Sequence, residues 1–227
     1  MTEPRSKTMT VAVLGATGMV GSRAVREAAA RGHRVLAVSR KPTGDDPDVT
    51  PVAVDVSDAD ALREVLTDPP GPGAPDAVVL AVRTEPADQE FLVGVTRTVL
   101  ETAARRGTRV LVVGGAGALR SPEDAELLVA DNPRYVPAGL RPVAIAGVAQ
   151  LRACRESAHA DWVYLSPPGL LEPGDRTGRY RRGTGTMLAG ADGRSWISAE
   201  DLAVAVLDEL ESPGPDRHVT VVHRAAD

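Results

Sequence analysis

Residues 11–21 read VAVLGATGMVG, in which four apolar residues are followed at once by three glycines spaced G-x-x-G-x-x-G. A continuous apolar run is typical of a strand in a parallel sheet that is covered on both faces. After the glycines, Val20, Ala24 and Ala28 recur every four residues and Gly32 follows, so residues 19–31 are predicted to form a helix. The segment therefore predicts a strand, a glycine-rich turn and a helix, which begin a βαβ unit.

The same organisation continues along the chain, where further apolar runs alternate with helical stretches. The runs cover residues 35–38, 52–54, 77–82, 110–113 and 162–165. One intervening helix is predicted to begin at Pro86 and to end at Gly107. Its apolar stripe consists of Phe91, Val95, Val99 and Ala103. Another helix is predicted to begin at Pro142 and to run to about residue 159. This alternation predicts an α/β fold with a Rossmann-type doubly wound parallel sheet.

The pattern changes after residue 165. Residues 166–197 read as loops and short strands, and we expect them to form a small C-terminal cap over the sheet. The sequence SAED at residues 198–201 is a capping box, which predicts a helix to about Leu210, and residues 218–222 predict a last strand. No internal repeat or long linker is found. We therefore expect residues 10–227 to form a single domain after a flexible N-terminus of residues 1–9.

Composition excludes several classes of function. The 26 Lys and Arg residues against 31 Asp and Glu give a formal charge of −5, which argues against a general nucleic-acid-binding surface. The single cysteine, Cys154, cannot form an internal disulfide, and the four histidines lack metal-ligand spacing. The first ten residues, MTEPRSKTMT, lack the apolar stretch of a secretory signal, and no segment approaches 18 uninterrupted apolar residues. We expect a cytoplasmic monomer or homodimer that acts on a small molecule, without a metal, nucleic acid or membrane.

The three glycines after the first strand suit the phosphates of a nucleotide. Gly15 allows a tight turn, Gly18 lets backbone N–H groups approach a pyrophosphate, and Gly21 lets the helix lie close to the sheet. The helix N-terminus supplies a favourable partial positive charge. The alternative is a glycine-rich turn that binds nothing.

The residues after the second and third strands bear on the choice of dinucleotide. NAD-specific proteins usually place an acid after the second strand, whereas this chain has Ser39-Arg40-Lys41. Arg40 can pair bidentately with a 2′-phosphate, so NADP(H) is expected in preference to NAD(H), unless Arg40 is only a solvated loop cation. Asp55 could accept from the adenine amino group while Val56 packs on the ring. Alternatively, Asp55 caps a helix near Ser57.

The nicotinamide is expected across the carboxyl ends of the fourth to sixth strands. These ends read Ala81-Val82-Arg83, Gly114-Gly115-Ala116 and Ser166-Pro167-Pro168-Gly169. Small residues there would let a planar ring lie against the backbone. Packing alone is the alternative explanation for the glycines.

A proton-shuttling tyrosine is missing. Dehydrogenases that act on alcohols commonly use Tyr-x-x-x-Lys, but Tyr135, Tyr164 and Tyr180 are followed four residues on by glycine, proline and threonine. Carbonyl reduction and sugar epimerisation by that machinery are therefore disfavoured. Hydride transfer to a flavin or quinone gives a delocalised anion that solvent can protonate, so it needs no strong general acid.

Four arginines crowd the segment that follows. They are Arg176, Arg179, Arg181 and Arg182, opposed within the stretch only by Asp175. We interpret them as a solvated hairpin face, with an anionic substrate or a partner subunit as the alternative.

Four blocks carry a resemblance to a known family. They are GATGMVGSRAVREAAARGHRV, LVVGGAGAL, DWVYLSPPGLLEPGDRTGRYR and ISAEDLAVAVLDELE, which begin at residues 15, 111, 161 and 197. Together they resemble the atypical short-chain dehydrogenase group of NAD(P)H-binding, NmrA-like proteins and predicted NADH-flavin reductases, and more distantly biliverdin reductase B. The resemblance covers about residues 10–222. It implies a reductase that depends on positioning rather than on a catalytic tetrad. It also implies an NADPH site built on Gly15, Thr17, Gly18, Met19, Arg40, Asp55 and Val56.

Two departures from the group's pattern lie near the expected substrate pocket. Pro168 follows Pro167 where a small residue is expected, and Arg141 stands where a lysine is commoner. The identity of the substrate is therefore not carried over from the group.

These observations define the candidate site. The candidate cofactor-binding residues are Gly15, Thr17, Gly18, Met19, Val20, Arg40, Asp55, Val56, Ala81, Val82, Arg83, Gly114, Gly115 and Pro167. The candidate substrate-binding residues are Tyr135, Arg141, Pro168 and Arg179. No catalytic side chain is identified. The expected function is NADPH-dependent hydride transfer to a flavin, quinone or related conjugated acceptor. The alternatives are a non-catalytic NADP(H)-sensing regulatory protein and a non-redox tailoring enzyme of secondary metabolism.

Overall fold

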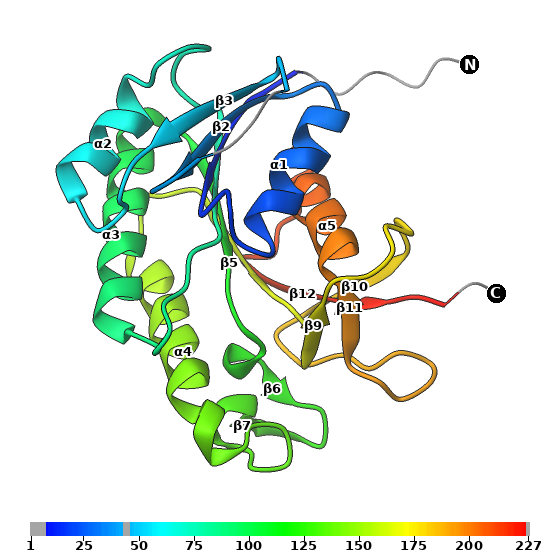
Figure 1. Ribbon diagram of the computed structural model, residues 1–227. Helices are drawn as coiled ribbons and strands as arrows, with labels where there is room; N and C mark the ends of the chain where they lie inside the picture. Colours follow the sequence, from blue (N-terminus) through cyan, green and yellow to red (C-terminus); the bar gives the residue numbers. More distant parts are fainter. Residues whose placement is uncertain (1–7, 43–45, 226–227) are drawn as a thin grey trace.

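The computed structural model describes residues 8–42 and 46–225. Its central sheet has eight strands in the order β10-β12-β8-β5-β4-β1-β2-β3 (Figure 1). Their bounds are β1 Thr10–Leu14, β2 Arg34–Ser39, β3 Val49–Ala53, β4 Ala77–Leu80, β5 Arg109–Val113, β8 Trp162–Ser166, β10 Tyr180–Thr184 and β12 His218–His223. All neighbouring strands are parallel except β10, which runs antiparallel to β12. Strand order proceeds outward in both directions from β1, so the predicted doubly wound sheet is confirmed.

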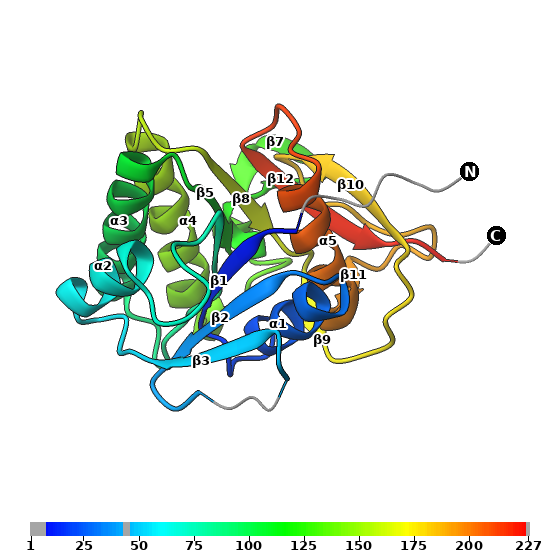
Figure 2. The ribbon, with the colours of Figure 1, turned by 90° about the horizontal axis from the view of Figure 1, so that it is seen from above.

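Helices cover both faces of the sheet (Figure 2). One layer contains α1 Gly21–Ala30 and α5 Ala199–Glu211, and the other contains α2 Ala59–Thr67, α3 Gln89–Arg106 and α4 Arg141–Glu156. Each layer packs on its own cluster of mainly valine, leucine and alanine side chains. Successive residues of each strand point to opposite faces, so strands buried between two layers read as continuous apolar runs.

The predicted helices form, but some of their bounds differ. α3 begins at Gln89 rather than at Pro86, because the carboxylate of Asp88 accepts from the backbone N–H of Phe91 at 2.9 Å and caps the helix there. Gly107 ends α3 in the left-handed conformation, with φ of 69°, as predicted. α1 begins at Gly21, two residues later than predicted, and α4 ends at Glu156.

Two smaller lobes lie at the carboxyl ends of the strands. One contains the hairpin of β6 Arg120–Ser121 and β7 Asp124–Leu128, followed by the short 3-10 helices η2 Val129–Asp131 and η3 Ala138–Leu140. The other contains the parallel pair β9 Leu170–Glu172 and β11 Trp196–Ser198. Residues 166–197, which were expected to form one cap, therefore belong to two parts of the structure. β9 and β11 form the second lobe, whereas β10 extends the main sheet.

The described N-terminal residues join the sheet at Met9. Most of the predicted flexible segment 1–9 lies outside the described residues. Its last residue, Met9, is half-buried, and its carbonyl accepts from the N–H of Arg34 at 2.9 Å. No helix in the described parts of the chain is long and apolar enough to span a membrane.

Candidate nucleotide site

Two glycines of the turn between β1 and α1 are required by the fold itself. Gly15 has φ of +86°, and a Cβ there would lie 2.4 Å from the carbonyl oxygen of Ala81, which follows β4. A Cβ on Gly21 would lie 2.1 Å from the carbonyl oxygen of Gly15. The N–H groups of Gly15 and Ala16 both donate to Val38 in β2, at 3.0 and 3.1 Å. The turn is thus fixed against the ends of three strands.

The third glycine is the one that faces outward. Gly18 is exposed, and a Cβ there would lie 3.2 Å from the carbonyl oxygen of Gly15 and 3.9 Å from that of Ala81. The N–H of Gly18 itself donates to the carbonyl oxygen of Gly15 at 2.9 Å. If Gly18 lets backbone N–H groups approach a pyrophosphate, as predicted, the donors are those of its neighbours. Nothing else on the described part of the protein occupies the space around Gly18 closely.

The neighbouring backbone donors are unpaired. Within residues 8–42 and 46–225, the N–H groups of Thr17, Met19 and Val20 donate no hydrogen bond, and no side chain caps α1. They stand at the positive end of a ten-residue helix. Unpaired donors beside an open glycine fit the pyrophosphate of a dinucleotide, which would be bound by the chain's backbone.

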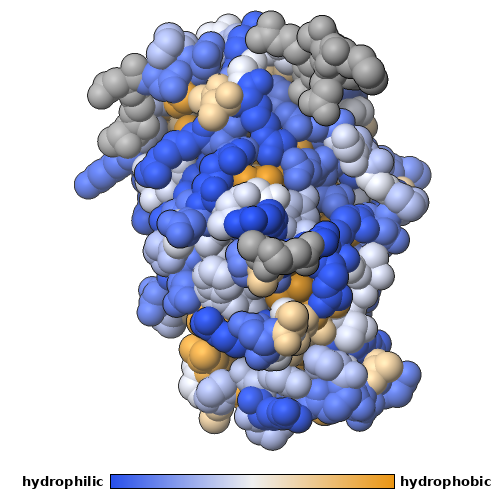
Figure 3. Space-filling model, turned by 90° about the vertical axis from the view of Figure 1, so that its right-hand side faces the viewer, coloured by the Kyte–Doolittle hydropathy of each residue, from blue (hydrophilic) through white to orange (hydrophobic). Residues whose placement is uncertain are grey.

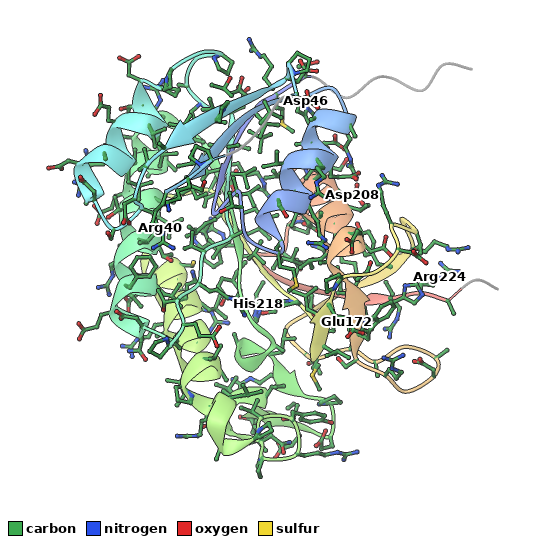
Figure 4. All side chains as sticks on the ribbon, viewed as in Figure 1. Arg40, Asp46, Glu172, Asp208, His218 and Arg224 are labelled. Atoms are coloured by element: carbon green, nitrogen blue, oxygen red, sulfur yellow. The ribbon has the colours of Figure 1, made fainter. Side chains whose placement is uncertain are left out.

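The adenosine-side candidates lie beyond β2 and β3. Arg40 is exposed directly after β2 (Figure 4). Asp55 Oδ1 accepts from the N–H and the hydroxyl of Ser57 at 3.0 and 2.8 Å, and these bonds, with a smaller contribution from Arg40, lower the pKa of Asp55. The alternative role of Asp55 as a helix cap is wrong, because Asp58 caps α2. Val56 is half-buried against the core.

The candidates after β4 differ in exposure. Ala81 donates its N–H to Leu14 in β1 at 2.9 Å and is half-buried, as is Val82. The side chain of Arg83 is 80% exposed and lies 3.9 Å from Glu85, a contact too loose and too solvated to fix the guanidinium.

The two glycines after β5 have different reasons to be glycine. A Cβ on Gly114 would lie 2.0 Å from the ring of Tyr164, so packing alone, the alternative given above, is enough to require glycine at this position. Nothing lies within 4 Å of a Cβ added to Gly115. Its carbonyl accepts from the hydroxyl of Ser166 at 3.0 Å, and Pro167, the next residue, is buried.

Sequence reasoning missed a histidine that joins this edge. His218 is the first residue of β12 and is labelled in Figure 4. Its Nε2 lies 3.0 Å from the hydroxyl of Ser166, and its ring meets that of Tyr164 edge-on, with centroids 5.6 Å apart. Burial lowers the pKa of His218 to about 4, with a smaller contribution from Arg155, so the imidazole is neutral near pH 7. The contact between His218 and Ser166 requires β12 to lie beside β8, and no local sequence pattern predicts that these strands are neighbours.

The three tyrosines are engaged in other contacts. Tyr164 is fully buried and donates to a main-chain carbonyl of α4 at 2.8 Å, and burial raises its pKa. Tyr180 donates to Asp208 at 2.6 Å and also has a raised pKa, mainly through burial. Tyr135 donates to Glu123 at 2.8 Å. A raised pKa stabilises the protonated phenol, which is opposite to what a Tyr-Lys pair achieves.

The substrate-binding candidates are spread over both lobes. Tyr135 belongs to the lobe of β6 and β7, and Arg141, the first residue of α4, pairs with Asp131 of that lobe at 2.9 Å. Pro168 is buried before β9, and Arg179 is exposed before β10. Within residues 8–42 and 46–225, no hydrogen bond or ion pair joins any two of these four residues, and Tyr135 and Arg141 each bind a neighbouring carboxylate.

The arginine-rich segment is largely neutralised by carboxylates from elsewhere. Arg176 pairs with Glu27 of α1 through two hydrogen bonds of 2.6 and 2.7 Å. Arg182 pairs with Glu209 and, at 2.8 Å, with Asp216. The interpretation of the segment as an anionic-substrate site is therefore wrong for these two arginines.

Comparison with known proteins identifies relatives along almost the whole chain. The chain is 34% identical over 223 residues to the uncharacterized protein YwnB of Bacillus subtilis, which covers 96% of this chain and 100% of YwnB. It is 30% identical to a Streptomyces protein named 3-diazoavenalumate denitrifying reductase, which covers 90% of this chain and 73% of that protein.

Solved structures share the fold at similar identity. A Bacteroides thetaiotaomicron protein described as a "putative epimerase" has a TM-score of 0.84 and 32% identity, covering 97% of this chain and 100% of its own. A Streptococcus pneumoniae "putative NADH-flavin reductase" has a TM-score of 0.80 and 27% identity, covering 95% and 99%. A model of the family described as NAD(P)H-binding matches residues 15–213, which begin at the first glycine of the turn and end beyond α5. The chain therefore belongs to the NAD(P)H-binding family of reductase-like Rossmann proteins.

Proposed function

We propose that the protein is an NADPH-dependent reductase that delivers hydride to a flavin, a quinone or a related conjugated acceptor. The observation that carries the proposal is the group of unpaired backbone donors at Thr17, Met19 and Val20, which stands beside the open face of Gly18. These donors would hold the pyrophosphate, and bound NADPH would supply the hydride from its nicotinamide ring.

The preference for NADPH rests on Arg40. Its guanidinium follows β2 in the position where an acid would select NADH, and among the described residues it acts electrostatically on Asp55, whose pKa it helps to lower. The guanidinium can bind a 2′-phosphate through two parallel hydrogen bonds. The name of the Streptococcus pneumoniae relative mentions NADH, so the preference is a point on which this chain is proposed to differ.

The class of acceptor follows from how the tyrosines are used. Because each tyrosine donates to a carbonyl or carboxylate, none is poised to give a proton to a reduced carbonyl. An acceptor whose reduced form is a delocalised anion avoids that requirement. Reduction is also the activity in the names of the Streptomyces and Streptococcus relatives. We place the acceptor at Gly115 and Pro167, with Tyr135, Arg141, Pro168 and Arg179 as the candidate residues that bind it.

Two measurements test the proposal in sequence. Calorimetric titration with NADPH and NADH should show binding of both and a preference for NADPH. Absorbance at the nicotinamide band should then fall when riboflavin, FMN or a soluble quinone is added to enzyme and NADPH. Binding without oxidation of NADPH by any acceptor would favour the sensing role. Product formation without consumption of hydride would favour a non-redox tailoring enzyme. Absence of binding to either nucleotide would overturn the proposal.

A further inference from the structure

A chain of three hydrogen bonds connects the glycine turn to a distant segment. Arg23, in the first turn of α1, donates from Nη1 to the carbonyl oxygen of Met19 at 2.8 Å. Its Nε donates to Glu200 Oε1 at 2.5 Å, and Glu200 Oε2 accepts from the N–H of Gly174 at 2.8 Å. The side chains of Arg23 and Glu200 are only 17% and 22% exposed, so solvent screens this ion pair less than an open surface pair.

The bond to Met19 has a consequence for the donors of the turn. The carbonyl of Met19 and the N–H of Val20 belong to one planar trans peptide, so they point in opposite directions. By holding the carbonyl of Met19, Arg23 also fixes the direction of the unpaired N–H of Val20. A backbone donor that is oriented in advance loses less freedom when it binds an anion.

The other end of the chain of bonds is a fixed segment. Residues 173–178, here called the strap, join β9 to β10 on a largely hydrophilic face of the molecule (Figure 3). Asp201 of α5 is fully buried and accepts from the N–H and hydroxyl of Thr177 at 2.7 and 2.5 Å and from the N–H of Gly178 at 2.8 Å. Arg176 binds Glu27 of α1. α1 and α5 lie side by side beneath it (Figures 1 and 2).

We propose that Arg23 and Glu200 are positioning residues that orient the pyrophosphate-binding peptide of Met19 and Val20 and couple its occupation to the strap. The inference rests on the proposed NADPH site. It goes beyond that site because neither side chain touches the nucleotide, and because α5 and the strap come from the opposite end of the chain. Occupation of the turn would tighten the bond network that holds the strap, and with it the lobe of β9 and β11.

The test compares two ligands that share the 2′-phosphate but differ in the pyrophosphate. NADPH and adenosine 2′-monophosphate are titrated by calorimetry into the wild type, Arg23→Met and Glu200→Gln. Because a Val20 N–H that is no longer oriented in advance must be ordered when the pyrophosphate binds, both variants should bind NADPH roughly tenfold more weakly. The affinity for adenosine 2′-monophosphate should stay within about twofold, because that ligand does not reach the turn. Arg26→Met is the matched control, since Arg26 is an exposed arginine of the same helix and should leave both affinities unchanged.

Hydrogen exchange at residues 174–178 provides the second readout. NADPH should slow exchange at these amides in the wild type and not in Glu200→Gln, which keeps an acceptor for Gly174 and so preserves the local fold. Equal weakening of the two ligands, or no weakening of NADPH in either variant, would overturn the positioning role while leaving the NADPH site intact. Unchanged exchange on NADPH binding would overturn the coupling to the strap. Failure of NADPH to bind the wild type would overturn the proposed function and this inference together.

Discussion

The nucleotide side and the acceptor side of the molecule use their side chains differently. Around the glycine turn, the N–H groups of Thr17, Met19 and Val20 are unpaired within the described residues and Gly18 is exposed. The nearby side chain of Arg23 donates to the backbone of the turn. On the acceptor side, two polar side chains that were expected to meet an acceptor bind neighbouring carboxylates instead: Tyr135 binds Glu123, and Arg141 binds Asp131. A binding site formed by backbone groups depends on glycines that are neighbours in the chain, so it can be predicted from a short stretch of sequence. A site made of side chains depends on which partners the fold brings to them.

The largest expected effect is on folding stability, and it should distinguish Gly21, which the fold requires, from Gly18, which the nucleotide requires. Gly21→Ala should destabilise the protein by about 4 kcal/mol or more, because its Cβ would lie 2.1 Å from the carbonyl oxygen of Gly15. Gly18→Ala should fold with nearly the wild-type melting temperature and lose affinity for both NADPH and NADH. Thermal unfolding and calorimetry of the two variants measure this. Similar melting temperatures for both variants would contradict the comparison.

A second expected effect is a dependence of the free energy of unfolding on pH, which arises from His218 on the acceptor side. Because burial lowers the pKa of His218 from 6.5 to about 4, the unfolded chain binds this proton more tightly than the folded one. Stability should therefore be fully present above about pH 6.5 and decline as the pH falls towards 4, by up to about 3 kcal/mol. His218→Gln should flatten this part of the profile in urea unfolding experiments. A profile of unchanged slope in the variant would show that His218 is not the titrating group.

A third effect tests selectivity on the nucleotide side. Arg40→Ala should weaken NADPH binding by about 1.5–3 kcal/mol, since it removes charged hydrogen bonds to the 2′-phosphate. NADH binding should change little. Lys41→Ala, next to it in sequence, controls for the loss of one positive charge. Equal losses for NADPH and NADH in Arg40→Ala would refute the assignment.

The smallest expected effect belongs to the exposed pairs of the lobes. Tyr135→Phe removes the hydroxyl that donates to Glu123, and the melting temperature should change by less than about 2 °C, because exposed polar pairs contribute little. The KM for a conjugated acceptor should change less than twofold. A large rise in KM with unchanged stability would show that the Tyr135 hydroxyl contacts the acceptor. It would then contradict the difference between the nucleotide side and the acceptor side.

Sequence reasoning succeeds where the determinant is local. The continuous apolar run of β1, the glycine turn and the left-handed Gly107 each follow from residues that are neighbours in the chain. It fails for contacts between distant elements. Gly114 is a glycine because Tyr164, 50 positions away, packs on it, and the pair of Ser166 and His218 needs β12 to lie beside β8. The predicted start of α3 at Pro86 is wrong because the Asp88 side chain caps the helix, which begins at Gln89.

The two edges of the sheet limit how copies of the protein can associate. One edge strand, β3, contains Pro51, which has no N–H to offer a further strand. The other, β10, has Arg181 and Arg182 at its centre, and charged side chains on an edge resist pairing with another chain. Both edges thus discourage growth into a continuous intermolecular sheet. A homodimer of this protein would accordingly be built from helices or lobes, and aggregation through open β-edges is suppressed by the sequence of the two outermost strands.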